Sequence, residues 1–105
     1  MEILNAVKAL SSLAQERRLK IFRLLVRIGP QGTPVGQIGE KLDIPLSTLS
    51  FHLSQLKHAG LVNCRRESRT LYYSVNYPSM NELMAYLTEN CCKGNLESCD
   101  IPDCM

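Results

Sequence analysis

Residues 33–60 carry the pattern of two short helices joined by a turn of only three residues. Thr33 followed by Pro34 is typical of a helix start, with threonine as the N-cap and proline at the first helical position. The letters DIP at residues 43–45 form the turn, and Gly60 ends the second helix as a C-cap glycine. The sequence therefore predicts a helix-turn-helix motif in the middle of the chain.

The first helix of this motif contains two glycines, which lower its intrinsic stability. Gly36 and Gly39 each cost about 1 kcal/mol relative to alanine inside a helix. We expect close packing to compensate at both positions, with Val35, Ile38 and Leu42 facing the core.

Three more helices and a hairpin are predicted around the motif from hydrophobic periodicity. They cover residues 3–13 and 15–28, two strands at 61–66 and 70–76 with a polar tip at 67–69, and residues 79–90 after Pro78, which we expect to break the chain. We expect Ile3, Leu4, Val7, Leu10 and either Leu13 or Ala14 to share one face of the first helix, and Met80, Leu83, Met84 and Leu87 one face of the last. The predicted fold is one domain, mainly α with a β-hairpin wing.

The charges are unevenly distributed along the chain. Residues 1–78 contain eleven Lys and Arg against five acids, a net charge of +6, whereas residues 79–105 carry a net charge of −4. A basic body indicates a polyanionic partner, and an acidic end would be kept away from it. No apolar run approaches the roughly 20 residues of a membrane span, and charges interrupt the first residues, so we expect a cytoplasmic protein with reduced cysteines.

The second helix of the motif has one apolar and one polar face. Leu46, Leu49, Leu53 and Leu56 form the predicted inward stripe. Small hydroxyls, an amide and an aromatic ring suit the edges of base pairs in a groove of DNA. The predicted reading face and its border consist of Ser47, Thr48, Ser50, Phe51, Ser54, Gln55, Lys57 and His58.

Three arginines lie near the tip of the predicted hairpin. Arg65, Arg66 and Arg69 follow directly after the reading helix, and we expect them, with Lys57, to contact phosphates as mobile cations. A helix-turn-helix followed by a basic hairpin indicates a winged helix that binds double-stranded DNA.

Three motifs then resemble the ArsR/SmtB family of winged-helix repressors over about residues 8–90. LAQERRLKIFRLL (residues 13–25) is similar to the family pattern Leu-Ala-Asp-Pro-Thr-Arg-Leu-Arg-Ile-Leu, with Arg18 at the family's arginine. STLSFHLSQLKHAGLV (residues 47–62) resembles Ser-Thr-Val-Ser-x-His-Leu-x-x-Leu-x-x-Ala-Gly-Leu-Val, and LYYSVN (residues 71–76) resembles the returning strand of the wing.

The resemblance implies a non-enzymatic, metalloid-responsive repressor. It would bind an inverted-repeat operator as a homodimer, built from the first and last helices, and leave DNA when an inducer binds. The apolar stripes of those two helices agree, because a second copy would cover them. We expect residues 1–90 to form the DNA-binding and dimerisation domain and residues 91–105 an inducer-binding segment, with no cofactor required for DNA binding.

Two further residues are expected to be structural. His52 matches the family's histidine and borders the leucine stripe, so we interpret it as a structural or phosphate-contacting residue and not as a metal ligand. Cys64 alternates with Val62 on its strand and is expected to be buried.

The inducer site is expected at the C-terminal cysteines. In the family, zinc sensors commonly use histidines on the last helix and other arsenic sensors a Cys-Val-Cys motif in the reading helix; neither is present here. Cys91, Cys92 and Cys99 could bind As(III), or Sb(III), through three thiolates, because soft ligands select soft ions. Cys104 could supply a fourth ligand to zinc. A methylated arsenical, cadmium, an oxidant or a zinc-stabilised interaction module are the alternatives, together with an inert segment.

Overall fold

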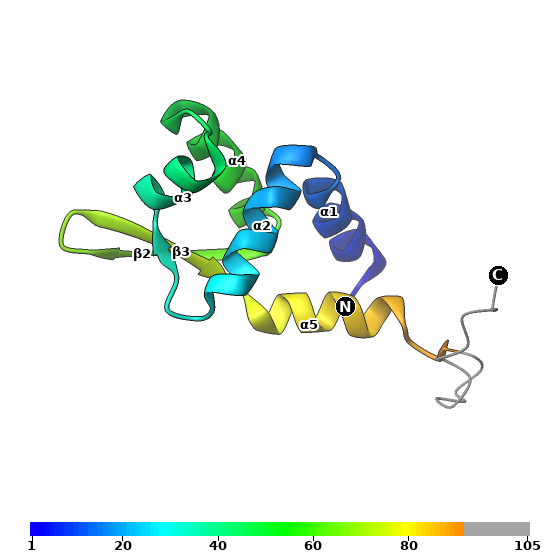
Figure 1. Ribbon diagram of the computed structural model, residues 1–105. Coiled ribbons are helices and arrows are strands. Elements are labelled where there is room, and N and C mark those ends of the chain that lie inside the picture. Colours follow the sequence, from blue (N-terminus) through cyan, green and yellow to red (C-terminus); the bar gives the residue numbers. More distant parts are fainter. Residues whose placement is uncertain (92–105) are drawn as a thin grey trace.

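The computed structural model describes residues 1–91, and within them five helices and two hairpin strands follow one another in the predicted order, with one further short strand that was not predicted (Figure 1). Their bounds are α1 Ile3–Leu13, α2 Glu16–Ile28, β1 Thr33–Pro34, α3 Val35–Leu42, α4 Leu46–His58, β2 Val62–Glu67, β3 Thr70–Val75 and α5 Tyr77–Leu87. The β2–β3 hairpin extends away from the helices, and α5 runs beneath α1 and α2 in this view. This is the winged helix-turn-helix fold that the sequence predicts.

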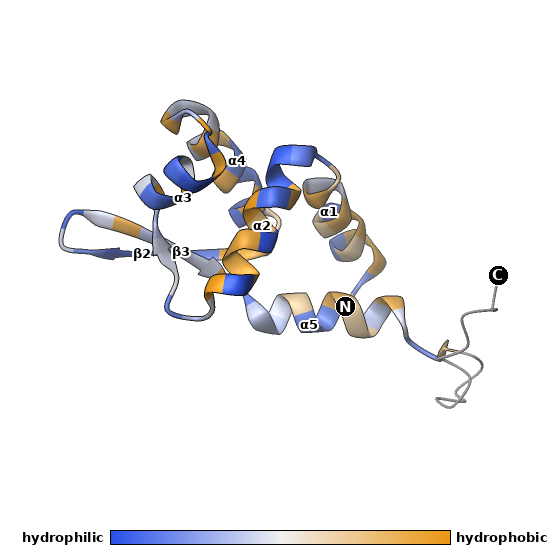
Figure 2. Cartoon of the chain, in the orientation of Figure 1, coloured by the Kyte–Doolittle hydropathy of each residue, from blue (hydrophilic) through white to orange (hydrophobic). Residues whose placement is uncertain are grey.

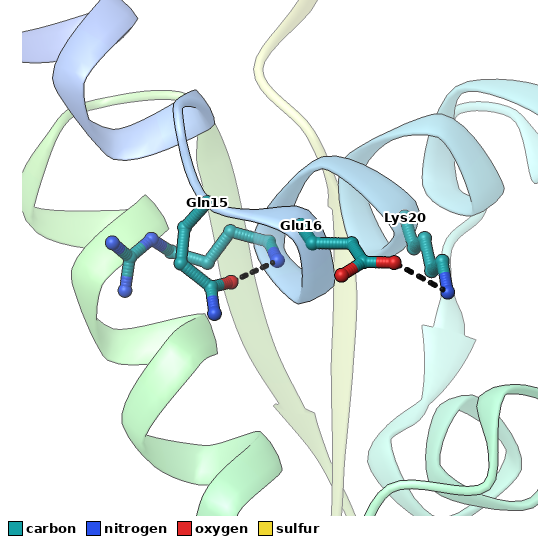
Figure 3. Close-up of polar contacts among 4 residues, drawn as sticks. Gln15, Glu16 and Lys20 are labelled. Carbon is teal, nitrogen blue, oxygen red and sulfur yellow. Dashed lines mark hydrogen bonds and ion pairs between the residues drawn. The ribbon is translucent and has the colours of Figure 1, made fainter.

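A side-chain cap starts α2 close to the end of α1. The Gln15 side chain accepts a hydrogen bond from the backbone N–H of Arg18 at 2.9 Å, which satisfies one of the unpaired amides of the first turn (Figure 3). The carboxylate of Glu16 lies 3.4 Å from Nζ of Lys20, one turn further along α2, in an exposed ion pair that the same view shows. Such a pair adds only a few tenths of a kcal/mol, so the cap and the buried face of the helix hold α2 in place.

The predicted N-cap at Thr33 is wrong. Thr33 and Pro34 form the short strand β1, which pairs antiparallel with Tyr73 and Tyr72 of β3, and α3 begins only at Val35. The strand order is β1-β3-β2, so Pro34 lies on an edge strand, where its missing N–H leaves no ladder bond unmade. Pairing with the wing therefore determines the conformation of these two residues.

The turn between α3 and α4 is tight because its backbone folds back on α3. Asp43 takes the left-handed conformation with φ 54°, and the N–H of Ile44 donates to the carbonyl of Gly39 at 3.1 Å. A Cβ on Gly39 would lie 3.2 Å from the Ile44 carbonyl oxygen, which confirms the close packing predicted there. A Cβ on Gly36 would have no neighbouring atom within 4 Å beyond its own helix, so the same prediction is wrong for that residue.

The wing is a hairpin with a two-residue tip. Glu67 pairs with Thr70, so Ser68 and Arg69 alone make the turn, one residue fewer than predicted. Burial decreases from the Val62–Val75 pair, which is buried, toward the exposed tip. Cys64 is half-buried and not buried as expected. It follows Val62 on the same face of β2, nearer the exposed tip of the wing.

The last helix begins two residues earlier than predicted. Asn76 caps α5 by accepting from the N–H of Ser79 at 3.3 Å, and Pro78 lies in the first turn. Proline is compatible with a first turn because its missing N–H would have no helical partner there. Pro78 thus helps to start α5 and does not break the chain.

The core lies where α2, α3 and α4 meet the base of the hairpin. Its largest fully buried side chains are Ile21, Leu25, Ile38, Leu49, Leu53, Leu56 and Leu61. The leucine stripe of α4 is confirmed except for Leu46, which is 60% exposed. Leu46 is the first residue of the helix, and the core does not extend to that turn.

The large apolar residues of α1 face away from the core of their own chain. Ala6, Ala9 and Ser12 pack inward, whereas the predicted stripe is exposed, with Leu4 at 75%, except for Leu13, which is half-buried against the core. On α5, Leu83 is buried, but Met84 is 59% and Leu87 is 57% exposed. Figure 2 shows apolar residues on both of these helices, which pack against each other.

Candidate nucleic-acid interface

The outer face of α4 consists of the side chains expected to read DNA. Ser47, Ser50, Phe51, Ser54, Gln55, Lys57 and His58 are exposed, and Thr48 is half-buried. Leu49, Leu53 and Leu56 anchor the opposite face in the core, so the polar face points outward along the whole helix. The structure thus places all eight predicted α4 residues on or beside one surface that can enter a major groove.

His52 is a structural residue that fixes the orientation of α4. Its ring is 7% exposed, and Nδ1 lies 3.3 Å from a guanidinium nitrogen of Arg18. Arginine only donates, so Nδ1 accepts and the ring proton belongs on Nε2. Burial first, then the positive charges of Arg18 and Arg17, lower the pKa of His52, which keeps the imidazole neutral near pH 7. The structural interpretation of His52 is supported.

Arg18 connects three helices. Its Nε donates to the carbonyl of Ser12 at 2.7 Å, near the end of α1, while its guanidinium contacts His52 on α4. Its own N–H is capped by Gln15 at the start of α2. The family resemblance pointed to this arginine. That it joins α1 to α4 could not be read from the sequence, because its contact with His52 spans 34 residues.

The three wing arginines are not equivalent. Arg65 donates from Nη1 to the carbonyl of Gln31 at 2.9 Å, lies 3.5 Å from the Glu67 carboxylate, and stacks over the Tyr72 ring at 4.8 Å. The expectation that it is a mobile cation is wrong, because the loop before β1 and the neighbouring strand hold it. The side chains of Arg66 and Arg69 are exposed and form no ion pair or hydrogen bond within residues 1–91.

The base of the wing and the end of α4 share an open cavity. Ser54, Lys57 and His58 from α4 and Tyr73 from β3 line a space of about 440 Å³. Burial, and then the adjacent Cys64 thiol, raise the pKa of Tyr73 to about 12, so its phenol keeps its proton. A protonated phenol beside Lys57 can donate to a phosphate oxygen. The sequence interpretation missed Tyr73. Successive side chains of a strand point to opposite faces, so one tyrosine of the doublet Tyr72-Tyr73 has to face the helices, and this alternation is the signal that could have found it.

The expected inducer residues lie mostly outside the described part of the chain. Cys91 is half-buried one turn beyond α5, where its N–H donates to the carbonyl of Thr88 at 3.0 Å. Cys92, Cys99 and Cys104 lie outside the described residues. Within residues 1–91, no group of three His, Cys, Asp or Glu side chains is arranged to hold a metal ion. A three-thiolate site at Cys91, Cys92 and Cys99 stays a prediction.

None of the helices in residues 1–91 combines the length and the apolar character needed to cross a lipid bilayer.

A helix-turn-helix with a polar outer face, followed by a wing with exposed arginines, defines a winged helix-turn-helix DNA-binding protein. A family model described as a helix-turn-helix domain matches residues 13–65. The transcriptional activator HlyU of Vibrio cholerae is 33% identical over 91 residues, covering 87% of this chain and 82% of HlyU. The solved HlyU structure matches with a TM-score of 0.66 at 36% identity, over 83% of this chain and 97% of HlyU.

Two other solved structures place the chain within a named family. The homodimeric winged helix-turn-helix domain of a possible ArsR-family regulator from Mycobacterium bovis matches with a TM-score of 0.67 at 29% identity, covering 90% of this chain and 83% of that domain. A possible transcriptional regulator for arsenical resistance matches with a TM-score of 0.67 at 28% identity, over 76% of this chain and 80% of that one. The chain belongs to the ArsR family of winged helix-turn-helix transcriptional regulators.

Proposed function

We propose that this chain is a homodimeric repressor that binds an inverted-repeat operator and leaves it when As(III), or Sb(III), binds Cys91, Cys92 and Cys99. The observation that carries the proposal is the position of α5. Its exposed apolar face, at Met84 and Leu87, leads within four residues to the first of the closely spaced thiols. A thiol-bound ion and a dimer contact would therefore share one helix end.

The exposed apolar faces of α1 and α5 support a dimer. Large aliphatic side chains exposed on two neighbouring helices cost free energy in water, and a second copy would bury them. Each copy would offer the same faces, as a two-fold interface requires. The homodimeric state described for the Mycobacterium bovis domain agrees with this proposal.

A two-fold dimer determines the form of the operator. Each copy presents one α4, so the two helices would enter major grooves about one turn of DNA apart and read an inverted repeat. Base edges would be contacted by the polar residues of α4, namely Ser47, Thr48, Ser50, Ser54, Gln55 and His58. Phosphates would be contacted by Lys57, Arg66 and Arg69. Arg65 would hold the wing in position and contact the backbone with its remaining N–H groups.

The proposed inducer chemistry is an exchange of hydroxide for thiolate. Arsenite at neutral pH is As(OH)₃; three thiols each give a proton, three waters leave, and three As–S bonds form. Acidic neighbours at Glu89, Glu97, Asp100 and Asp103 disfavour free thiolates, but the bound ion displaces the protons itself. Cys104 is a further candidate ligand.

Inducer binding would act on DNA through the dimer. Joining Cys91 to Cys92 and Cys99 would constrain the chain just beyond Leu87 and re-pack the end of α5. The distance between the two α4 helices would then no longer match the operator. Such couplings typically amount to about 1–3 kcal/mol, or 5- to 150-fold in affinity.

The test is operator release with cysteine variants of the full chain. We expect arsenite to release wild type, and Cys91→Ser, Cys92→Ser and Cys99→Ser each to bind DNA normally without release. Cys64→Ser, on the wing, is the matched control and should be released like wild type. Release that survives in a chain shortened to end at Asn90 would refute the thiol site.

The same experiment separates the alternatives. A methylated arsenical needs only two thiols, so Cys99→Ser would still respond to it. Release by cadmium or an oxidant, with arsenite inactive, would keep the DNA-binding role and change the signal. Stoichiometric zinc without any operator footprint would instead indicate an interaction module.

A further inference from the structure

Phe51 is an exposed aromatic residue in the middle of an otherwise polar helix face. Its side chain is 57% exposed, although α4 buries leucines at Leu49 and Leu53 on either side of it in sequence. A largely exposed ring buries little apolar surface in the free chain. Its place on the reading face therefore calls for an apolar partner in the bound state.

The neighbours of Phe51 leave its ring prominent. Ser47 and Ser54 lie one turn before and after it on the same face, and Ser50 is adjacent; all three are exposed. Because serine side chains are short, the phenyl ring extends beyond them and would reach the floor of a groove first.

The ring is also held from below. Its centroid lies 5.6 Å from that of His52 at an interplanar angle of 60°, and His52 is buried against Arg18 at 3.3 Å. Arg18 thus contacts His52, and His52 contacts Phe51. A pre-positioned side chain loses little conformational freedom when it binds.

We propose that Phe51 is a specificity-determining residue that selects thymine through its 5-methyl group. A phenyl ring has no hydrogen-bonding group, and the thymine methyl is the apolar group that base pairs present in the major groove. Serine hydroxyls on either side can bond several bases, so they discriminate less sharply. The inference rests on the proposed role of α4 as the groove-reading helix.

Deoxyuridine tests the inference because it differs from thymidine only by that methyl group. The full-length protein first selects its operator from a random duplex library, and each thymine is then replaced by uracil. Each half-site should contain one thymine that matters: replacing it in a single half-site should weaken wild-type binding about fourfold, the equivalent of about 0.8 kcal/mol for one buried methyl group. Replacing it in both half-sites should weaken binding about 15-fold.

Phe51→Ala should bind the thymine and uracil operators equally, while its unfolding midpoint stays near that of wild type because the ring is exposed. Leu46→Ala, the other exposed apolar residue of α4, is the matched control and should keep the preference for thymine. A preference that persists in Phe51→Ala, or a wild type indifferent to every uracil, would overturn the inference. A protein that selects no sequence from the library would contradict the proposed function instead.

Discussion

Arg18 and His52 show how a single buried pair can determine the position of a reading helix. The guanidinium needs an acceptor at Nδ1, and burial together with two nearby arginines keeps the imidazole neutral. Arg18 also bonds the backbone of α1. The orientation of α4 relative to α1 therefore depends on the protonation state of one histidine.

The lowered pKa of His52 makes stability depend on pH in a defined direction. The unfolded chain takes up a proton near pH 6.5, whereas the folded chain resists it until a lower pH. The free energy of unfolding should thus fall as pH decreases from 6.5 toward the lowered pKa. We expect His52→Asn, whose Oδ1 can replace the Nδ1 acceptor, to remove this part of the pH dependence in urea unfolding. His58→Asn should keep it, and an unchanged slope in His52→Asn would contradict the assignment.

At the scale of elements, the wing is joined to the helix-turn-helix through β1 and the loop before it. Gly32 approaches the wing so closely that a Cβ would lie 2.7 Å from the carbonyl oxygen of Tyr73, and its φ is +75°. Arg65 adds a hydrogen bond from the wing to Gln31 in the same loop. These contacts fix the angle between the wing and the helix-turn-helix.

Two glycine substitutions should change stability in opposite directions. Gly32→Ala meets a backbone atom and an unfavourable φ, so we expect a loss of about 2 kcal/mol or more in the free energy of unfolding. Gly36→Ala lies in the first turn of α3 with free space around its Cβ and should gain about 0.5–1 kcal/mol. Chemical denaturation of both variants measures this, and a stable Gly32→Ala would refute the close approach.

The exposed and the anchored wing arginines should have different effects on DNA binding. Arg69→Ala removes a phosphate contact, so it should weaken binding to all sequences alike and reduce the salt slope by about 1 for each copy. Arg65→Ala also releases the wing from Gln31, and we expect a larger loss of affinity than the salt slope explains. Titrations at several salt concentrations distinguish the two, and equal losses would argue against anchoring.

At the scale of the whole molecule, the apolar surface is divided between a core and an outer face. Residues from α2, α3, α4 and the base of the hairpin fill the core together with Leu83 of α5, while four large apolar residues of α1 and two of α5, Met84 and Leu87, are exposed. One chain therefore folds around the helix-turn-helix, and the remaining apolar surface is available to a second copy.

A charge on the outer face of α1 should prevent dimer formation without unfolding the chain. Leu4 is 75% exposed, so Leu4→Glu removes no core contact but would place two carboxylates in the two-fold interface. We expect monomers with a wild-type circular dichroism spectrum and a large loss of operator affinity. Val26→Glu, an exposed residue of α2, should stay dimeric in sedimentation measurements. A dimer that persists in Leu4→Glu would contradict the proposed interface.

Local sequence was sufficient for the order and type of the five helices and the hairpin, and for the polar outer face of α4. Periodicity, a three-residue turn and Gly60 are short-range signals, and each residue responds to neighbours within one or two turns. The same signals failed at Thr33 and Pro34, where a strand 40 residues away determines the conformation, and at Pro78, whose effect depends on the Asn76 cap.

The sequence by itself determined a winged helix-turn-helix whose second helix has a polar outer face, because amphipathic periodicity and turn chemistry act locally. Only the tertiary structure decided that Ala6, Ala9 and Ser12 are the residues of α1 that pack inward, that Arg65 is anchored, and that Arg18 contacts His52. Each of these depends on which distant surfaces meet, and the packing of the small face of α1 leaves its large side chains for another molecule.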